Sequence, residues 1–402
     1  MQNGRLILIL GALTALGPFS IDMYLPAFLK VANDLQIPVL RMSLTLSSFF
    51  VGLAAGQLFY GPLLDRFGRK YPLYAGLSLY VAASLGCAAA QTLETLIALR
   101  ALQALGACSA GVASMAMVRD FFTEQESAKV FSLLILILGV SPLLAPTLGG
   151  FLATTLGWRS IFVLLAAMGL ALLAVCRFYL PEKYAPDPTV SLRLGPIVRE
   201  YLAILRNAQF LTYALAAALA LCGLFVYLAS SPMIFMTIFK VTPQVYGWIF
   251  GLLAAGFVGS SQLNFLLLRR FSNDQILRAG LIGLTLTGIA FLAGTLAGWY
   301  GIKGTMLMLF LFLAFFGISG PNASALALAP FSRNAGSASA MLGFLQMGLG
   351  TVASIGVGLL KAQDLLPVAA MFAGSGLLAL TIFSLGTRHI RRRVPLKGGS
   401  YA

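Results

Sequence analysis

Two charged residues stand apart because they lie inside long apolar runs of the chain. Asp22 is the one acidic residue of twelve in such a position, and Arg100 is the one basic residue of 27 that lies more than three residues from the end of a run. If these runs cross a membrane, burying a carboxylate there costs roughly 2.5–3.5 kcal/mol on insertion scales, so such an acid marks a candidate functional site. Desolvation favours the neutral acid, whereas a nearby positive charge favours the carboxylate. Asp22 and Arg100 are therefore our candidate proton-coupling residues, with a static buried pair as the structural alternative.

Further polar or amphipathic side chains within the apolar runs are candidates for contacting a substrate. They are Tyr24, Gln57, Gln103, Tyr227, Gln262, Asn322 and Gln346. With Asp22 and Arg100 they predict an adaptable cavity, apolar and aromatic with few polar groups. The alternative for each residue is a hydrogen bond to a neighbouring helix, worth about 0.6 kcal/mol.

The runs that carry these residues are long enough to span a membrane. Of 402 residues, 59% are hydrophobic and 10% are charged, against roughly a quarter charged in soluble domains. A helix needs about 20 apolar residues to cross a bilayer. Twelve runs qualify: Leu6–Leu29, Met42–Leu64, Tyr71–Gln91, Leu96–Val118, Val130–Leu156, Ile161–Leu180, Phe210–Ile238, Tyr246–Leu268, Ile276–Gly298, Thr305–Leu328, Ala335–Leu360 and Leu366–Leu385. The sequence thus predicts an all-α membrane protein with twelve transmembrane helices.

The net charge of +15 is explained by topology better than by binding to nucleic acid. Twenty of the 27 Lys and Arg residues fall at the two ends of the chain and in alternate connections, and six fall in the other connections. Basic residues accumulate on the cytoplasmic side of membrane proteins. Both termini are therefore predicted to be cytoplasmic, with the basic tail Arg388–Arg393 touching anionic lipid headgroups.

A polar connection from Pro181 to Asn207 divides the chain into two halves with traces of a repeat. We expect a six-helix bundle over residues 1–182, a cytoplasmic linker over 183–207 and a second six-helix bundle with the basic tail over 208–402. The segments Leu63–Leu77 and Leu267–Leu281 match at 8 of 15 positions at an offset of 204 residues. Paired repeats of this kind are typical of secondary transporters, whose binding site lies between the repeats near the midplane.

Four motifs resemble the major facilitator superfamily. Its loop motif is matched by Gly61, Asp65, Arg66, Gly68, Arg69 and Lys70. The span-four motif of its drug/proton antiporters is matched by Arg100, Gln103 and Gly106, and the span-five antiporter motif by Gly139, Pro142, Pro146, Gly149 and Gly150, with Ser141-Pro142 in place of the usual Gly-Pro. The segment Ser20–Pro26 resembles the first span of the bicyclomycin/chloramphenicol-resistance branch.

The resemblance implies that spans one and four line one cavity. Asp22 lies seven residues before Leu29 and Arg100 six residues after Glu94, so both sit about 10 Å below the outer surface. We expect them to pair directly or through water, with proton and drug competing for this site. Thr14 stands where related multidrug transporters carry a further acid, which leaves the proton count open.

The resemblance also implies a conformational role for two of the motifs. Asp65, Arg69 and Asp120 are expected to form a cytoplasmic charge cluster that locks the outward-open state. The second half replaces Asp65 by Arg269 and Arg69 by Asn273, so this lock would be asymmetric. The small residues and prolines of span five are expected to form a hinge or seal, with ordinary close helix packing as the alternative.

The sequence therefore predicts a proton-coupled efflux transporter for amphenicol-like or other lipophilic antibiotics in a bacterial inner membrane, acting as a monomer. No Gly-Lys dipeptide is present, which excludes a phosphate-binding loop of the ATPase type. No cluster of ligands or nucleophile–base pair indicates a metal, a cofactor or an enzyme. The alternatives are a proton-coupled transporter of an amino acid or sugar and, more remotely, an intramembrane enzyme.

Overall fold

The computed structural model describes residues 2–181, 186, 194–331, 335–359 and 364–393, and these parts of the chain are helical apart from short connections. The α-helices are α1 (Gln2–Asp22), α2 (Phe28–Asp34), α3 (Ser43–Phe67), α4 (Lys70–Ala89), α5 (Leu93–Phe121), α6 (Glu124–Thr155), α7 (Arg159–Tyr179), α8 (Leu194–Leu205), α9 (Ala208–Pro232), α10 (Pro243–Leu267), α11 (Asn273–Leu296), α12 (Ile302–Leu328), α13 (Ala335–Leu359) and α14 (Leu366–Arg393). Two 3₁₀ turns, η1 (Leu25–Ala27) and η2 (Val39–Met42), and a π-helical turn, η3 (Met233–Ile238), complete the structure of these ranges.

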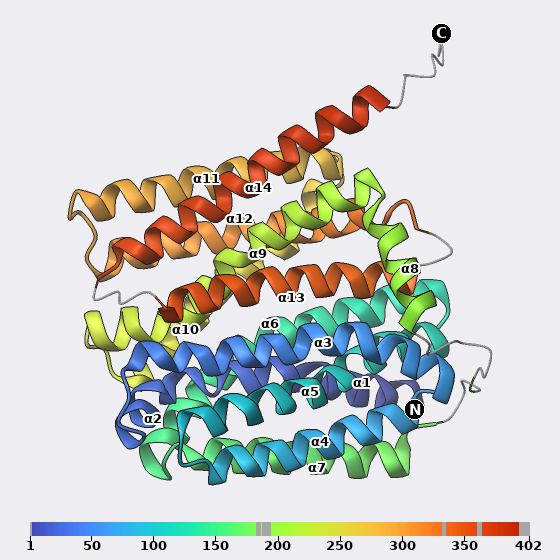
Figure 1. Cartoon of the computed structure of the whole chain (residues 1–402), viewed down its shortest axis with the longest axis horizontal. Coiled ribbons are helices and arrows are strands. Elements are labelled where there is room, and N and C mark those ends of the chain that lie inside the picture. Colours follow the sequence, from blue (N-terminus) through green and yellow to red (C-terminus); the bar gives the residue numbers. More distant parts are fainter. Residues whose placement is uncertain (1, 182–185, 187–193, 332–334, 360–363, 394–402) are drawn as a thin grey trace.

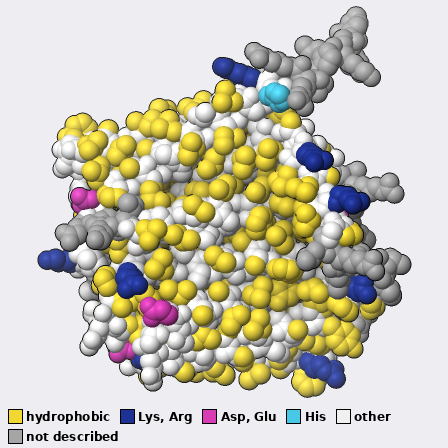
Figure 2. Space-filling model, viewed as in Figure 1, with side chains coloured by type: hydrophobic (Ala, Val, Ile, Leu, Met, Phe, Trp, Pro, Cys, Tyr) yellow, Lys and Arg dark blue, Asp and Glu magenta, His cyan; other side chains and the backbone are white. Residues whose placement is uncertain are grey.

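Eleven helices of the described chain are long and apolar enough to cross a membrane. At the position of the expected fifth span lies α6, with 32 residues. Hydrophobic side chains cover the broad middle of the face shown in Figure 2, and the described charged side chains gather toward its two ends. A helix satisfies its backbone hydrogen bonds internally, which is why long apolar runs adopt this structure in lipid.

The helices form two bundles that lie one above the other in Figure 1. Helices α1–α7 make up the first half and α9–α14 the second. The halves meet where α13 packs along α3 and α10 packs along α6. The start of α1, the linker helix α8 and the end of α14 all lie at one end of the molecule (Figure 1), which we call the linker end; the opposite end is the far end.

The first span is broken, whereas the sequence predicted one continuous helix over Leu6–Leu29. Helix α1 ends at Asp22, a turn follows at Met23 and Tyr24, and η1 leads into α2. Pro26 has no backbone N–H and therefore leaves the carbonyl of Asp22, four residues earlier, without its helical partner. The break thus places the acidic residue at a helix end.

The equivalent span of the second half is also irregular at this depth. Helix α9 ends at Pro232 and continues as the π-helical turn η3. Gln36 follows the first span and Lys240 the seventh, and both have φ of 54°, a backbone conformation that few non-glycine residues adopt. The two positions differ by 204 residues, the offset of the sequence repeat. The backbone therefore carries the same internal repeat as the motifs.

Candidate functional site

A cavity of about 780 Å³ opens between the two halves at the linker end. This volume lies in the range of roughly 300–1,000 Å³ that is typical of small-molecule sites. Its walls come from α3, α5, the linker helix α8 and the start of α13. They comprise Gln57, Gly61, Pro62, Leu64, Asp65, Arg69, Gly111, Val112, Met115, Ala116, Asp120, Pro196, Ile197, Glu200, Tyr201, Gly336, Ser337, Ser339 and Ala340.

The far end is closed by close backbone contacts of α6. Gly149 lies against the backbone of Met23 so closely that a Cβ at this position would overlap with it. A Cβ on Gly150 would lie 3.1 Å from the carbonyl oxygen of Pro243, which belongs to the other half. These two residues of the expected span-five hinge therefore bring the first span and α10 against α6; Gly139, Pro142 and Pro146 lie in the same helix.

Polar contacts add to the closure of the far end. The hydroxyl of Ser47 on α3 donates to that of Ser354 on α13 at 2.8 Å, and Gln244 Nε2 donates to Thr154 Oγ1 at 3.3 Å. Both hydrogen bonds join the two halves. Access to the space between the halves is therefore one-sided, open at the linker end and sealed at the far end.

Arg100 is fully buried within the first half. Its Nη1 donates to the backbone oxygen of Ser20 at 3.0 Å and to Gln103 Oε1 at 2.7 Å. The guanidinium carbon lies 4.8 Å from the ring centroid of Tyr24 and 4.3 Å from that of Phe49. Such cation–π contacts are strongest where water is excluded. Arg100 thus holds the first, second and fourth spans together.

Asp22 does not form an ion pair with Arg100, although the two share a depth. Asp22 is 5% exposed. Both residues lie in the described part of the chain, and no nitrogen of Arg100 is within ion-pairing distance of the Asp22 carboxylate. Ser20, which does contact Arg100, is two residues from Asp22, and two residues turn a helix by about 200°. Arg100 therefore contacts the backbone of the first span beside Asp22 and not the carboxylate itself.

The remaining predicted substrate contacts are dispersed. Gln57 lines the cavity. Gln103 is bound by Arg100 and donates to Ser84 at 2.8 Å, and the Tyr24 hydroxyl accepts from Thr45 at 3.2 Å. These last two residues serve the internal packing of the first half.

The predicted substrate contacts of the second half are dispersed as well. Asn322 donates to Asn264 Oδ1 at 2.7 Å, and Gln346 donates to Ser324 at 3.4 Å, so both bond neighbouring residues. Gln262 is exposed on α10 and is not part of the cavity wall. Tyr227 is buried and stacks on Phe250 at 5.4 Å between ring centroids.

The charge cluster Asp65–Arg69–Asp120 is formed on the cavity wall. Arg69 Nη1 lies 2.7 Å from Asp65 Oδ1, and Arg69 Nε lies 2.7 Å from Asp120 Oδ2. Burial lowers the pKa of Arg69, but the hydrogen bonds to Asp120 and Asp65 outweigh this effect and raise it overall. Gly68, with φ of 79°, makes the turn that brings Arg69 back toward α5.

The cluster coexists with a cavity that is open at its own end. That it locks the outward-open state stays a prediction; Asp65, Arg69 and Asp120 all belong to the first half, so these two ion pairs alone do not join the halves. In the same motif, Gly61 lines the cavity, Arg66 lies 5.9 Å from the ring centroid of Phe67, and Lys70 begins α4.

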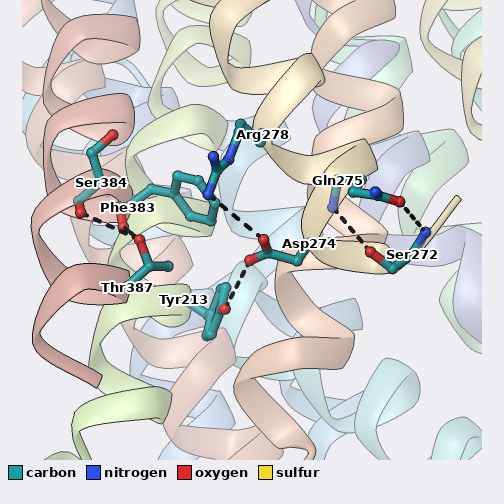
Figure 3. A network of polar contacts seen from close by, with 8 residues as sticks. All are labelled: Tyr213, Ser272, Asp274, Gln275, Arg278, Phe383, Ser384 and Thr387. Atoms are coloured by element: carbon teal, nitrogen blue, oxygen red, sulfur yellow. Dashed lines mark hydrogen bonds and ion pairs between the residues drawn. The ribbon is translucent and has the colours of Figure 1, made fainter. Parts of the chain in front are cut away.

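The matching loop of the second half carries a different network (Figure 3). Asp274 accepts a hydrogen bond from the Tyr213 hydroxyl at 3.1 Å and lies 3.8 Å from Arg278. The Arg278 guanidinium in turn lies 5.8 Å from the ring centroid of Phe383. This network joins α9, α11 and α14, whereas the first-half cluster joins the α3–α4 turn to α5. The two halves are thus stabilised differently at the linker end.

The contribution of the linker to the cavity was not predicted from the sequence. Pro196, Ile197, Glu200 and Tyr201 of α8 line it. The Tyr201 hydroxyl donates to the backbone oxygen of Leu58 on α3 at 3.3 Å. That carbonyl is free because Pro62, four residues later, has no N–H. The signal was present, because Ile197, Tyr201 and Ile204 have the spacing of one helix face.

Comparison with known proteins agrees with this architecture. The sequence profile of the Major Facilitator Superfamily matches residues 10–357. A Bacillus subtilis protein described as an uncharacterized MFS-type transporter, YdgK, is 33% identical over 387 residues, covering 94% of this chain and 95% of the relative. A bicyclomycin resistance protein homolog of Haemophilus influenzae is 29% identical and covers 96% and 97%. The multidrug resistance protein MdtL of Escherichia coli is 32% identical and covers 84% of each chain.

A solved D-xylose-proton symporter superposes with a TM-score of 0.76 at 16% identity, covering 95% of this chain and 98% of the symporter. At this identity the likeness shows the fold alone. The family match and the transporter relatives confirm that the chain is a transporter and not an enzyme. The chain belongs to the Major Facilitator Superfamily and resembles the drug/proton antiporters of its bicyclomycin/chloramphenicol-resistance branch.

Proposed function

We propose that this protein exports lipophilic antibiotics across the bacterial inner membrane in exchange for protons, by alternating access. The proposal is supported by the cavity at the linker end together with a buried acid beside the far-end seal. Asp22 precedes Met23, against which Gly149 seals the far end. When the far-end seal opens and the linker end closes, the Asp22 carboxyl becomes accessible from the far end instead of the linker end.

The orientation follows from the charge distribution. With twelve spans and both termini in the cytoplasm, the linker end faces the cytoplasm and the far end the outside. The structure then corresponds to a state in which a drug enters from the cytoplasm. A monomer contains the complete pathway between its two halves, and the basic residues of the linker end lie next to anionic lipid headgroups.

The transport cycle uses Asp22 as the site of competition. In the state open to the cytoplasm the carboxyl releases its proton to water in the cavity, and a drug binds. In the state open to the outside the drug leaves and the carboxylate is protonated again. A drug that donates a hydrogen bond to the carboxylate favours its charged form, and a proton on the carboxyl removes that acceptor, so each ligand weakens binding of the other.

The substrate class is supported by two relatives that are named for resistance to bicyclomycin and to multiple drugs. Amphenicol-like antibiotics are uncharged molecules that combine an aromatic ring with hydroxyl and amide groups, which suits a cavity lined by apolar residues such as Val112 and Met115 and by polar ones such as Gln57. Polar groups such as Glu200 and Ser337 also line the cavity, so transport of an amino acid or sugar is retained as the alternative.

Transport in proteoliposomes tests the proposal. A pH gradient of the appropriate sign should drive chloramphenicol into the vesicles above its equilibrium concentration, and a protonophore should abolish this accumulation. Accumulation of an amino acid or sugar without accumulation of antibiotic would favour the metabolite transporter. Antibiotic accumulation that is the same with and without the pH gradient would contradict proton coupling.

A further inference from the structure

The linker helix α8 is amphipathic, and contacts on one side fix its rotation. The Tyr201 hydroxyl donates to the Leu58 carbonyl oxygen on α3 at 3.3 Å, and Ile204, on the same face, is 2% exposed. The opposite face carries Val198 and Leu202, each 49% exposed. The helix therefore presents a defined side to the space between the two halves.

Glu200 lies on the inner side of α8 and lines the cavity. It is half-buried, and in the described part of the chain no lysine or arginine nitrogen lies within ion-pairing distance of its carboxylate. Tyr201, the next residue, holds this turn of the helix against α3. The cavity wall thus carries a negative charge that has no positive partner among these residues.

The other charged groups of the wall do not cancel this charge. Among the described lining residues, Asp65, Asp120 and Glu200 are acidic and Arg69 is basic, a formal net charge of −2 in a chain of net charge +15. Arg69 lies 2.7 Å from a carboxylate oxygen of each aspartate, and Glu200 has no share in these ion pairs. A cleft lined by charge of one sign concentrates ligands of the opposite sign.

We propose that Glu200 is a specificity-determining residue of this cavity, whose carboxylate favours cationic lipophilic drugs over uncharged drugs of similar size. The apolar part of such a drug packs against Val112 and Met115, which line the same cavity, while its positive charge lies toward α8. The selecting charge comes from the linker and from neither six-helix half. The inference rests on the proposed function and adds a class of ligand to it.

Binding of two probes of the same shape and opposite charge tests this role. Tetraphenylphosphonium is a cation and tetraphenylborate an anion, and their affinities for the full chain in detergent can be compared by equilibrium dialysis at low salt, with chloramphenicol as the uncharged ligand. Because water screens a half-buried charge, Glu200→Gln should weaken tetraphenylphosphonium binding about three- to fivefold. Chloramphenicol binding should stay unchanged.

Two further variants complete this comparison. Glu200→Lys should weaken tetraphenylphosphonium binding more than Glu200→Gln does, and it should strengthen tetraphenylborate binding. Glu94→Gln, at an exposed glutamate in the first turn of α5 that is not part of the cavity wall, is the control and should leave all three affinities unchanged.

The possible failures are distinguishable. Unchanged tetraphenylphosphonium affinity in Glu200→Gln overturns the inference, as does an equal loss of tetraphenylphosphonium and chloramphenicol binding. A native protein that binds chloramphenicol but no tetraphenylphosphonium also overturns it. A native protein that binds neither ligand would instead contradict the proposed function.

A measurement on the native chain covers the case in which the Glu200 variants do not fold. Salt screens the attraction between separated charges, so tetraphenylphosphonium affinity should fall as the salt concentration rises, while chloramphenicol affinity stays constant. Tetraphenylphosphonium affinity that is equal at low and high salt overturns the inference.

Discussion

Arg100 donates its hydrogen bond to the backbone oxygen of Ser20, at 3.0 Å, and not to the carboxylate of Asp22 two residues further along. This separates the two intramembrane charges. Arg100 ties α5 to the broken first span, while Asp22 is left out of this contact. We therefore propose that the acid exchanges protons and ligands and that the base positions the first span.

Replacing Arg100 by lysine tests that positioning role. The ammonium group of lysine lacks the planar fork of arginine and does not stack on Tyr24 and Phe49 in the same way. Arg100→Lys should lower the midpoint of thermal unfolding in detergent and weaken drug binding, with Arg177→Lys on the exposed face of α7 as the matched control. Equal unfolding midpoints for both variants would contradict the role.

The far-end seal predicts an unusual response to Gly149→Ala. Glycine to alanine inside a helix ordinarily stabilises it by up to about 1 kcal/mol. Here the added Cβ overlaps with the Met23 backbone, so the variant should destabilise the state shown and favour opening of the far end. Gly348→Ala on α13, where a Cβ meets open space, is the control.

The readout for this pair is labelling by an impermeant thiol reagent of a cysteine introduced at Ser47. Labelling from the outside should increase in the Gly149→Ala background and stay unchanged in the Gly348→Ala background. Unchanged labelling in both would show that Gly149 does not determine closure.

The charge cluster predicts unequal effects of its two acids. The Asp120 side chain is 15% exposed and that of Asp65 is 49% exposed. Solvent screening reduces exposed pairs to about 0–1 kcal/mol, so Asp120→Asn should lower the unfolding midpoint more than Asp65→Asn, and the difference should persist in 0.5 M salt. An equal response of the two variants would contradict this account.

The pH dependence of the same cluster follows from Arg69. Its folded-state pKa is raised above the unfolded value, so its contribution to stability is complete below the unfolded pKa and is lost only as the pH rises through the folded pKa. Arg69 should therefore contribute no pH dependence between pH 5 and 9. The unfolding midpoints of the native protein and Arg69→Gln should differ by a constant amount over this range.

The contact between Tyr201 and Leu58 depends on Pro62, and this dependence is testable by a double-mutant cycle. Tyr201→Phe should cost about 0.5–1.5 kcal/mol, the usual value of one hydrogen bond. In a Pro62→Ala background the alanine N–H can bond the Leu58 carbonyl, so Tyr201→Phe should have little further effect. Chemical unfolding of the four proteins measures the coupling, and additive effects would contradict it.

Much of the fold could be predicted from the sequence, because long apolar runs in lipid have few alternatives to helices. The charge cluster was also predictable, since a turn glycine and fixed spacing bring Asp65 and Arg69 together. The structure does not contain the expected direct ion pair between Asp22 and Arg100. Counting residues predicts the depth of a side chain in the membrane but not its direction around a helix. The break after Asp22 was missed although Pro26 signals it.

The sequence was less informative about contacts between elements far apart in the chain. Whether Gln262 faces the cavity or the outside of α10 depends on how α10 packs, which an almost uniformly apolar helix does not reveal. The linker helix α8 was read as a polar connection because its prolines and charges outweighed its apolar face. Tyr201 and Glu200 were therefore absent from the predicted site.

The central claim is that drug and proton compete at Asp22, and proton release on drug binding tests it most directly. The measurement uses detergent-solubilised protein in weak buffer near neutral pH, with chloramphenicol added to the native chain and to Asp22→Asn. The account predicts proton release by the native protein and none by Asp22→Asn. Drug binding with equal release by both proteins, or with none by either, would contradict it and leave Asp22 with a structural role.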